Sequence, residues 1–233
     1  MRIAVIGDVH GSSKWSSLIT RNEKEYDKLV FLGDYVDDWW ISDERIKEAL
    51  ADIIFYAEYE GSDTVKLLIG NHDYQYINPN CDYRSTGFRE KTYPELHELF
   101  SNHLDLFSFA YQVDDVLFTH AGVCHSWFTH FFEGDLNEDI ATQLNHPASL
   151  SQLKALTIVG TERGGWLPFG GPLWCDQAEL KEEPLKGYTQ VVGHTRTNEI
   201  EKYEHEHGVL YFADCLENMK ELPIFDTESK KFV

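Results

Sequence analysis

The sequence contains few cysteines and no long hydrophobic run. Its 233 residues include four cysteines, and no two of them form a Cys-x-x-Cys pair. This usage argues against a disulfide framework and a thiolate zinc cage, and we expect free thiols in a reducing compartment. The first apolar run, Ile3–Ile6, ends at Gly7-Asp8, so it is too short for a membrane span or a secretion signal. We therefore expect a cytoplasmic protein.

Basic residues are also scarce. The chain has 20 Lys and Arg against 40 Asp and Glu, which gives a formal net charge of −20. Such a field repels polyanions, so the composition argues against nucleic acids and anionic membranes as bulk partners. It does not count against a small phosphate ester that metal ions hold locally.

The chain shows no internal repeat, no low-complexity tract and no Gly/Ser/Pro linker. With 42% hydrophobic residues, its composition is that of an ordinary globular protein. A chain of this length buries enough surface to fold without disulfides or structural metals. We predict one domain that spans residues 1–233.

What recurs along the chain is a short apolar run that ends in a polar cluster. The five runs are Ile3–Ile6, Leu29–Leu32, Val65–Ile69, Val116–Phe118 and Val191–Val192. Runs of this length, rich in β-branched residues and closed by glycine, are typical of strands buried on both faces.

Helical patterns lie between the early runs. Apolar residues from Ile46 to Ala57 follow one helix face, with Ser42 as the expected N-cap and Gly61 as the expected stop. A shorter helix is expected near Ser13–Thr20. Strands and helices thus alternate up to about residue 70, which predicts βαβ units and a largely parallel sheet.

The rest of the chain is less regular. Residues 74–110 begin as an aromatic, loop-like segment and become helical from Pro94, so we interpret them as an insertion or cap over the strand ends. Residues 126–188 are expected to form an irregular loop region. From Tyr188 onward, strands and turns alternate up to Pro223–Asp226, which indicates a second sheet that closes an αββα sandwich.

Polar groups follow the five predicted strands at the point where ligand sites form in α/β sheets. The candidates are Asp8, His10, Asp34, Asn71, His72, His120 and His194. Oxygen and imidazole ligands without thiolate suit manganese, iron, zinc or magnesium. Seven candidates are too many for one four-coordinate ion and fit two ions that share a carboxylate. Such a pair can clamp the attacking and leaving oxygens of an in-line phosphoryl displacement.

The same positions carry a family resemblance. The blocks are Gly7-Asp8-Val9-His10-Gly11, Gly33-Asp34-Tyr35-Val36-Asp37, Gly70-Asn71-His72-Asp73, His120-Ala121-Gly122 and Gly193-His194-Thr195. In order and spacing, they resemble the calcineurin-like metallophosphoesterases. The most similar branch holds Ser/Thr protein phosphatases, phage phosphatases and symmetrical diadenosine tetraphosphate hydrolases. The resemblance implies an α/β fold: a four-layer αββα sandwich of two mixed sheets flanked by helices.

The resemblance also implies roles. Asp8 and His10 would bind a first divalent ion, Asp34 would bridge, and three further residues would bind a second ion: Asn71, His120 and His194. A hydroxide between the two ions would attack phosphorus in line. His72 would protonate the leaving oxygen, with Asp37 orienting it, because a nearby carboxylate keeps an imidazole protonated. Manganese is the first choice of metal, with iron, zinc and magnesium as alternatives.

One departure from the family pattern bears on the substrate. Asp38 stands where related phosphatases carry an Arg that grips the phosphate. Either another arginine substitutes (Arg163 or Arg196, with Arg84 and Arg89 ranked lower) or the substrate carries less charge.

Three hypotheses about function therefore stay open. The first is hydrolysis of phosphomonoesters, including phosphoprotein. The second is a phosphodiesterase or dinucleoside polyphosphate hydrolase, favoured by Asp38 and by Trp39, which could stack a base or could instead pack against the core. The third, remote one is a non-catalytic metal-binding scaffold.

Overall fold

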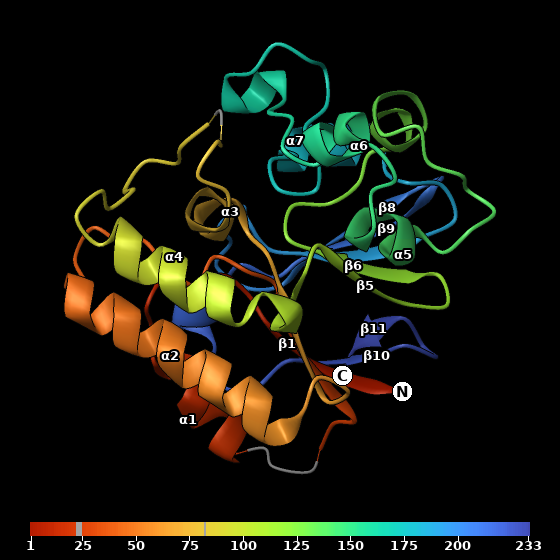
Figure 1. Ribbon diagram of the computed structural model, residues 1–233. Coiled ribbons are helices and arrows are strands. Elements are labelled where there is room, and N and C mark those ends of the chain that lie inside the picture. The colour runs from red at the N-terminus through yellow and green to blue at the C-terminus, as the bar shows by residue number, and fades with distance from the viewer. Residues whose placement is uncertain (22–24, 82) are drawn as a thin grey trace.

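The computed structural model describes residues 1–21, 25–81 and 83–233, and two sheets form its centre (Figure 1). The first has the order β11-β10-β1-β2-β3-β4 and the second the order β5-β6-β7-β9-β8. The strands of the first sheet are β1 (Arg2–Ile6), β2 (Lys28–Phe31), β3 (Val65–Leu68), β4 (Phe107–Ser108), β10 (Ile224–Asp226) and β11 (Lys231–Phe232). Those of the second are β5 (Ala110–Val113), β6 (Val116–Thr119), β7 (Thr189–Val192), β8 (Glu201–His205) and β9 (Gly208–Phe212).

Helices cover the outer face of each sheet. The helices are α1 (Lys14–Arg21), α2 (Asp43–Glu60), α3 (Asn71–Ile77), α4 (Tyr93–Asn102), α5 (Ile140–Asn145), α6 (Leu150–Ala155) and α7 (Gln177–Glu182). Figure 1 shows α1, α2 and α4 grouped beside the first sheet, and α5, α6 and α7 on the side of the second. The molecule is therefore an α/β sandwich of two mixed sheets flanked by helices, as the sequence predicts.

Side chains of alternate strand residues build separate cores, as the period-two geometry of a strand requires. Ala4 and Ile6 of β1 face the helices α1 and α2, whereas Ile3 and Val5 face the second sheet. Phe118 of β6 meets them in this core between the sheets. A third core lies between the second sheet and its helices. Both faces of the central strands are buried, which explains their continuous apolar runs.

The helix α2 has the ends that the sequence predicts. Ser42 has extended backbone and its hydroxyl accepts a hydrogen bond from the Arg45 N–H. Gly61 follows the last turn with φ 86°, and its N–H donates to the Ala57 carbonyl. The apolar stripe from Ile46 to Ala57 is buried against the first sheet.

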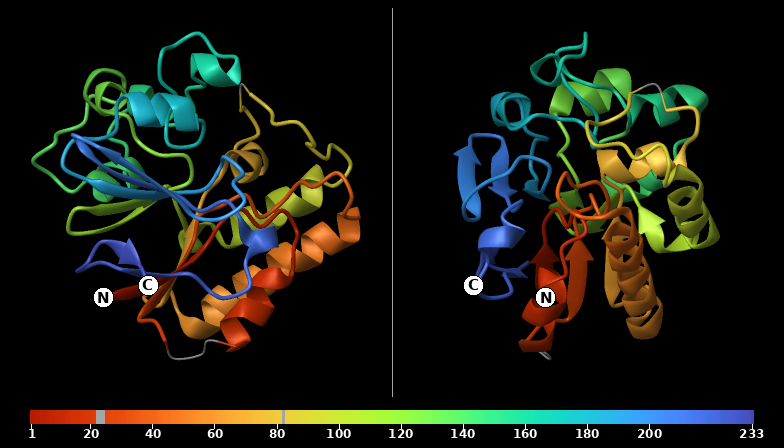
Figure 2. Two further views of the ribbon diagram at one scale, coloured as in Figure 1. Left: turned by 180° about the vertical axis from the view of Figure 1, so that it is seen from behind. Right: turned by 90° about the vertical axis from the view of Figure 1, so that its left-hand side faces the viewer.

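The structure corrects the expected place of the C-terminal strand. The sequence pattern predicts that Pro223–Asp226 belongs to the second sheet, but β10 pairs antiparallel with β1 in the first sheet. Figure 2 shows the C-terminal strands beside the N-terminal one. Phe225 enters the core between the sheets and Ile224 the core under α1 and α2. Because both faces of this short strand are apolar, its pattern fits either sheet.

The helix expected from Pro94 is present as α4, and the segments expected to be loop-like also contain regular elements. Within residues 74–110, residue 82 aside, lie the end of α3, all of α4 and the strand β4, which pairs with β3 in the first sheet. Residues 126–188 hold α5, α6 and α7, each of six residues. A helix of that length is too short to show a clear helical period in the sequence. In the described part of the chain, no helix combines the length and the apolar character that crossing a membrane requires.

Candidate metal centre and active site

Polar residues at the carboxyl ends of strands from both sheets meet at one edge of the sandwich. The strands β1, β2 and β3 run parallel in the first sheet, and β6 runs parallel to β7 in the second. The residues that follow them are Asp8 and His10 after β1, Asp34 and Asp37 after β2, Asn71 and His72 after β3, His120 after β6, and His194 after β7. Most of these residues line a cavity of about 530 Å³.

The backbone at this edge is held in conformations that non-glycine residues rarely adopt. His10, Asp34, Asp37 and His194 have φ values of 44°, 52°, 61° and 63°. Such left-handed residues cost free energy and persist where the surrounding structure dictates them, which is frequent at functional sites. Of these four residues, His10, Asp34 and His194 line the cavity.

Glycines in the same blocks allow the strand ends to approach the carboxylates. A Cβ on Gly70 would lie 2.1 Å from Asp34 Oδ1, and a Cβ on Gly193 would lie 2.3 Å from Asp8 Oδ1. Any side chain at these two positions would displace the carboxylates that the site contains.

The first cluster of possible ligands consists of Asp8, His10 and Asp34. His10 Nδ1 donates to the carbonyls of Val36, at 2.9 Å, and Asp37, at 2.7 Å. Its other nitrogen, Nε2, then carries a lone pair, which lies 3.7 Å from Asp34 Oδ2 and 4.0 Å from Asp8 Oδ2.

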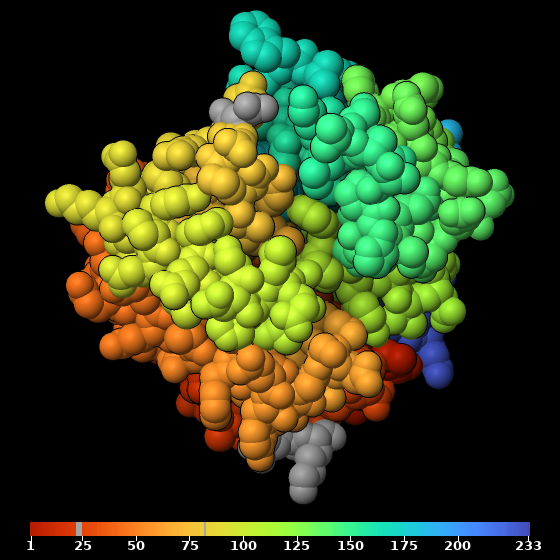
Figure 3. All heavy atoms as spheres, viewed as in Figure 1, coloured from red at the N-terminus to blue at the C-terminus, as the bar shows by residue number. Residues whose placement is uncertain are grey.

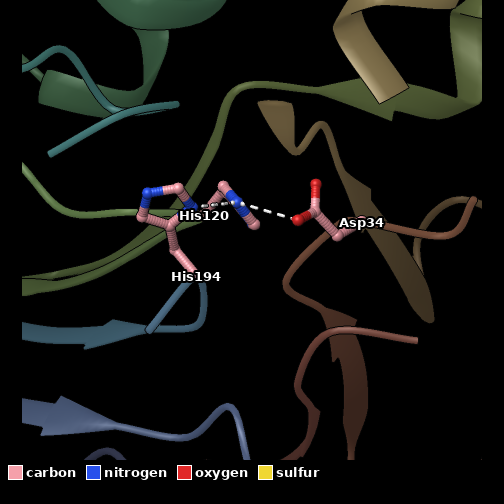
Figure 4. Close-up of side chains that lie close together, drawn as sticks. All are labelled: Asp34, His120 and His194. Atoms are coloured by element: carbon pink, nitrogen blue, oxygen red, sulfur yellow. Dashed lines mark hydrogen bonds and ion pairs between the residues drawn. The ribbon is translucent and has the colours of Figure 1, made fainter. Parts of the chain in front are cut away.

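The second cluster consists of Asp34, His120 and His194, with Asn71 beside them. His120 Nδ1 is 2.8 Å from the Leu32 carbonyl and donates to it, which leaves Nε2 with a lone pair. That atom lies 3.0 Å from His194 Nδ1, 3.0 Å from Asn71 Oδ1 and 3.5 Å from Asp34 Oδ2. Figure 4 shows His120 between the other two side chains of the cluster.

These donor sets fit divalent metal ions. In each cluster, the ligand atoms lie within 4.8 Å of one another, and Asp34 belongs to both clusters. Around His120 Nε2, acceptor atoms face acceptor atoms, an arrangement that only a proton or a cation stabilises. Burial lowers the pKa values of His120 and His194, which keeps both imidazoles neutral and able to bind a metal. The structure thus contains Asp and His groups that could hold metal ions.

His72 and Asp37 form a hydrogen-bonded pair beside these clusters. His72 Nδ1 lies 3.0 Å from Asp37 Oδ2, and Asp37 also accepts hydrogen bonds from Gln75 Nε2 at 2.5 Å and from the Tyr76 hydroxyl at 2.6 Å. Burial lowers the pKa of His72, but Asp34 and Asp37 outweigh it and raise that pKa to about 8. In this arrangement, His72 can carry a proton at neutral pH.

The sequence pattern that defines the calcineurin-like phosphoesterases matches residues 1–228 of the chain. The chain belongs to the calcineurin-like phosphoesterase family. This membership makes the protein a metal-dependent hydrolase of phosphoester bonds. No curated protein sequence matches the chain.

Solved structures share the fold of this phosphoesterase at low sequence identity. A cold-active protein-tyrosine phosphatase from the psychrophile Shewanella sp. is 20% identical, with 97% of this chain and 75% of that chain covered and a TM-score of 0.58. A Saccharomyces cerevisiae protein serine/threonine phosphatase with similarity to human phosphatase PP5 is 17% identical, with 91% and 67% covered and a TM-score of 0.51. These similarities concern the fold, so the substrate must be inferred from the site.

Asp73 of this phosphoesterase holds the backbone of the site in place, a role that the sequence pattern did not reveal. Its Oδ2 accepts the backbone N–H groups of Asp34, at 2.7 Å, and Gly70, at 2.8 Å, and its Oδ1 accepts that of Tyr35 at 2.8 Å. Asp73 is fully buried and joins the loop after β2 to the start of α3. The signal in the sequence is its place at the third residue of a helix, where acids reach back to the preceding backbone.

The arginines of the phosphoesterase divide into cavity and scaffold groups. Arg163, Arg196 and Arg84 line the cavity. Arg163 is held by two contacts: its Nε lies 2.7 Å from Asp176 Oδ2, and its Nη2 donates to Thr195 Oγ1 at 2.7 Å. Figure 3 shows residues around 80 and 160, which contribute Arg84 and Arg163, meeting on one face of the molecule.

Arg89 belongs to the scaffold instead. It pairs with Asp43 and donates to the backbone carbonyls of Asp38 and Ile41. It thereby fixes the turn that leads into α2.

Asp38 and the tryptophans after it lie at the rim. Asp38 Oδ1 accepts the backbone N–H groups of Trp40, at 2.7 Å, and Ile41, at 2.9 Å, so this acid stabilises a turn. Trp39 is 72% exposed and Trp40 92% exposed, which contradicts the alternative that the pair packs against the core. Trp39 and Arg196 share a hollow of about 270 Å³ with His72.

Proposed function

We propose that this phosphoesterase hydrolyses phosphomonoesters, phosphorylated Ser/Thr proteins among them, at a centre of two divalent metal ions. The observation that carries the proposal is the pair of ligand clusters that share Asp34. One shared carboxylate with nitrogen and oxygen donors on both sides is what two adjacent ions require.

Asp8, His10 and Asp34 would hold the first ion, and Asp34, Asn71, His120 and His194 the second. Mn²⁺ is the first choice for both, with iron, zinc and magnesium as alternatives, because the donors are carboxylate, amide and imidazole groups. When bound, such ions polarise phosphoryl oxygens and lower the pKa of water toward neutrality. The Asn71 side chain is oriented so that its amide oxygen can bind the second ion: Nδ2 donates to Ser85 Oγ at 2.7 Å, which turns Oδ1 toward His120.

His72 would donate a proton to the leaving oxygen of the ester. Its Nδ1 is hydrogen-bonded to Asp37, so Nε2 is the nitrogen available to the substrate. Gln75 and Tyr76 hold the Asp37 carboxylate, and the His72 ring therefore keeps a fixed orientation. A positioned general acid of this kind contributes about 10²- to 10⁴-fold in rate.

Arg163 and Arg196 would take the place of the arginine that Asp38 replaces. Arg163 is oriented in advance by Asp176 and Thr195, and it lines the same cavity as the ligand clusters. Guanidinium groups bind phosphate oxygens through paired hydrogen bonds, which suits a dianionic monoester. This assignment favours the monoester hypothesis.

A phosphodiester or a dinucleoside polyphosphate is the second candidate substrate. The exposed ring of Trp39 beside Arg196 favours it, because an aromatic ring next to a cation can stack a nucleobase. A non-catalytic scaffold has little support, since the chain belongs to an enzyme family and all ligand positions are filled.

The test compares p-nitrophenyl phosphate with bis-p-nitrophenyl phosphate in the presence of Mn²⁺, with Asp34→Asn as the blank. A higher kcat/KM for the monoester supports our proposal, and a higher value for the diester refutes it in favour of the second candidate. No hydrolysis of either compound above the blank would refute both.

We also propose a cytoplasmic location, which the four free cysteines support. The net charge of −20 supports the absence of nucleic acid and anionic membranes among its bulk partners.

A further inference from the structure

A buried glutamine joins two parts of the site. Gln75 lies on α3, one helical turn after Asn71, and only 1% of its surface is exposed. Its Nε2 donates to Asp37 Oδ2 at 2.5 Å, and its Oε1 accepts the backbone N–H of Ser85 at 2.8 Å. Because a carboxylate only accepts and a backbone N–H only donates, one orientation of the Gln75 amide satisfies both partners. Gln75 therefore fixes Asp37 and Ser85 relative to each other.

The Ser85 end of this connection leads to the second ligand cluster. Ser85 is buried and lines the main cavity, and its hydroxyl accepts a hydrogen bond from Asn71 Nδ2 at 2.7 Å. With Nδ2 engaged in this way, Asn71 Oδ1 faces His120 Nε2, which is 3.0 Å away. The position of Ser85 therefore sets the direction of the amide oxygen of Asn71.

The Asp37 end leads to the proposed proton donor. Asp37 Oδ2 accepts hydrogen bonds from Gln75 Nε2 and, at 3.0 Å, from His72 Nδ1. The Tyr76 hydroxyl donates to the other oxygen, Oδ1, at 2.6 Å, and it accepts the Arg89 N–H at 2.7 Å. In the described part of the chain, these are the two partners of the Tyr76 hydroxyl. Tyr76 thus supports the proton donor, whereas Gln75 also reaches the metal side of the site.

The chain around Ser85 is anchored on α3. The Phe88 ring stacks on that of Tyr76, with centroids 5.0 Å apart and an interplanar angle of 23°. The Phe88 N–H donates to the Ser85 carbonyl at 3.3 Å. Buried polar networks with satisfied members rigidify the groups that they join. Ser85 is therefore held between the Phe88 turn and the Gln75 amide.

We propose that Gln75 is a positioning residue that couples the general acid to the second metal ion. Through Asp37 it fixes the ring of His72, and through Ser85 it fixes the amide oxygen of Asn71. The proposal rests on the proposed two-ion function, because it requires that Asn71 binds an ion and that His72 donates the proton. Loss of the Gln75 amide should therefore weaken a metal site to which Gln75 contributes no donor.

The test titrates Mn²⁺ into the metal-stripped full-length protein and follows binding by calorimetry. The wild type is expected to bind two ions per chain. Gln75→Met keeps a side chain of similar length without the amide, and one of its two ions should bind about 10- to 100-fold more weakly, the loss typical of supporting groups at metal sites. Tyr76→Phe is the matched control, because it removes a donor to Asp37 but keeps the ring stack and the Ser85 contact. This control should keep both affinities.

A double variant shows whether the effect runs through Ser85. Ser85→Ala removes the hydroxyl that engages Asn71, so it should weaken the same ion. Because both changes act on the orientation of Asn71, their losses should not multiply in the double variant of Gln75→Met and Ser85→Ala. Losses that multiply would overturn the proposal, since Gln75 would then act independently of Ser85.

Turnover at saturating Mn²⁺ tests the other end of the connection. Gln75→Met and Tyr76→Phe each remove a donor to Asp37, so both should lower kcat on phenyl phosphate more than on p-nitrophenyl phosphate. An unchanged kcat of Gln75→Met on both esters would overturn the proposal, because His72 would then not depend on Gln75.

The metal titrations separate the proposal from the function on which it rests. If Gln75→Met binds both ions as the wild type does, the proposal is wrong and the two-ion centre stands. An equal loss of affinity in Tyr76→Phe also overturns it, because the loss would then come from Asp37 and not from Ser85. If the wild type binds fewer than two ions, the two-ion centre fails, and the proposal fails with it.

A crystal structure of the wild type with Zn²⁺ does not depend on the folding of any variant. Asn71 Oδ1 bound to an ion, with Gln75 hydrogen-bonded to Asp37 and Ser85 at the same time, supports the proposal. A Gln75 amide that has left either partner when the ions are bound overturns it.

Discussion

Asp73 accepts a hydrogen bond from the backbone N–H of Asp34 at 2.7 Å, and this bond fixes the residue that both ligand clusters share. The same Asp73 oxygen accepts the Gly70 N–H. One buried side chain therefore sets the spacing between the loops after β2 and β3. The Asp34 side chain makes a further link to the start of α3, because its Oδ1 accepts a hydrogen bond from the backbone N–H of His72 at 2.9 Å.

Replacing Asp73 with Asn should therefore damage both folding and the metal centre. An amide has one acceptor oxygen, so its NH₂ group would face at least one backbone N–H of Asp34, Gly70 or Tyr35. A buried donor left unsatisfied costs about 1–3 kcal/mol, and the free energy of unfolding should fall by at least that amount in urea denaturation. Asp63→Asn, on an exposed turn, is the charge-matched control and should change it by less than about 0.5 kcal/mol. Equal stability of the two variants would contradict the role that we assign to Asp73.

Replacing His72 with Asn should reduce turnover in a way that depends on the leaving group. Phenyl phosphate needs a proton on its departing oxygen more than p-nitrophenyl phosphate does. If His72 is the general acid, kcat should fall by about 10²- to 10⁴-fold on phenyl phosphate and by less on p-nitrophenyl phosphate. Metal content, measured in parallel by mass spectrometry, should stay at the wild-type value. An equal loss on both esters would show that His72 is not the proton donor.

Replacing Arg163 with Gln tests whether this arginine grips the phosphate. Hydrogen bonds to charged groups contribute about 1.5–3 kcal/mol, so kcat/KM for a phosphomonoester should fall by about 10- to 150-fold. The loss for a diester should be smaller, because its phosphate carries one charge fewer. Arg45→Gln is a suitable control, since Arg45 lies on the exposed face of α2 and pairs with Glu48. Comparable kinetics of Arg163→Gln and the control would leave Arg196 as the phosphate-binding arginine.

The strand ends that carry the site could be predicted because each is a local pattern. An apolar run followed by a glycine and a ligand residue specifies the strand, the turn and the donor within a few residues, as at Ile6-Gly7-Asp8. The packing of β1, β2 and β3 as parallel neighbours then brings their ends together. Burial on both faces made these strands recognisable without any contact information.

The missed parts of the site act through contacts that no local pattern encodes. Asp73 binds backbone N–H groups 38 and 39 residues away, and any acid at the start of a helix would look the same in the sequence. The strand β10 was assigned to the wrong sheet because pairing with β1 brings together residues more than 200 positions apart.

Removal of the metal ions should destabilise the folded protein, because the ligand clusters bring buried carboxylates and imidazoles close together and a cation between them would stabilise this arrangement. Asp8 and Asp34 repel each other in the folded protein, and burial together with Asp214 and Asp34 raises the pKa of Asp8. Mn²⁺ should therefore stabilise the folded state: at a free concentration 100 times its Kd, one ion adds about 2.7 kcal/mol. Differential scanning calorimetry of metal-stripped protein should show a clear rise of Tm on addition of Mn²⁺.

Two variants serve as controls for the rise of Tm with Mn²⁺. Asp34→Asn removes the carboxylate that both clusters share, so it should abolish most of the rise in Tm. Ser42→Ala removes the N-cap of α2 and should lower Tm through a loss of about 0.5–2 kcal/mol, yet it should keep the full rise with Mn²⁺ because α2 contributes no ligand. A rise that survives in Asp34→Asn would mean that Mn²⁺ binds elsewhere on this acidic protein, and the two-ion centre would have to be given up.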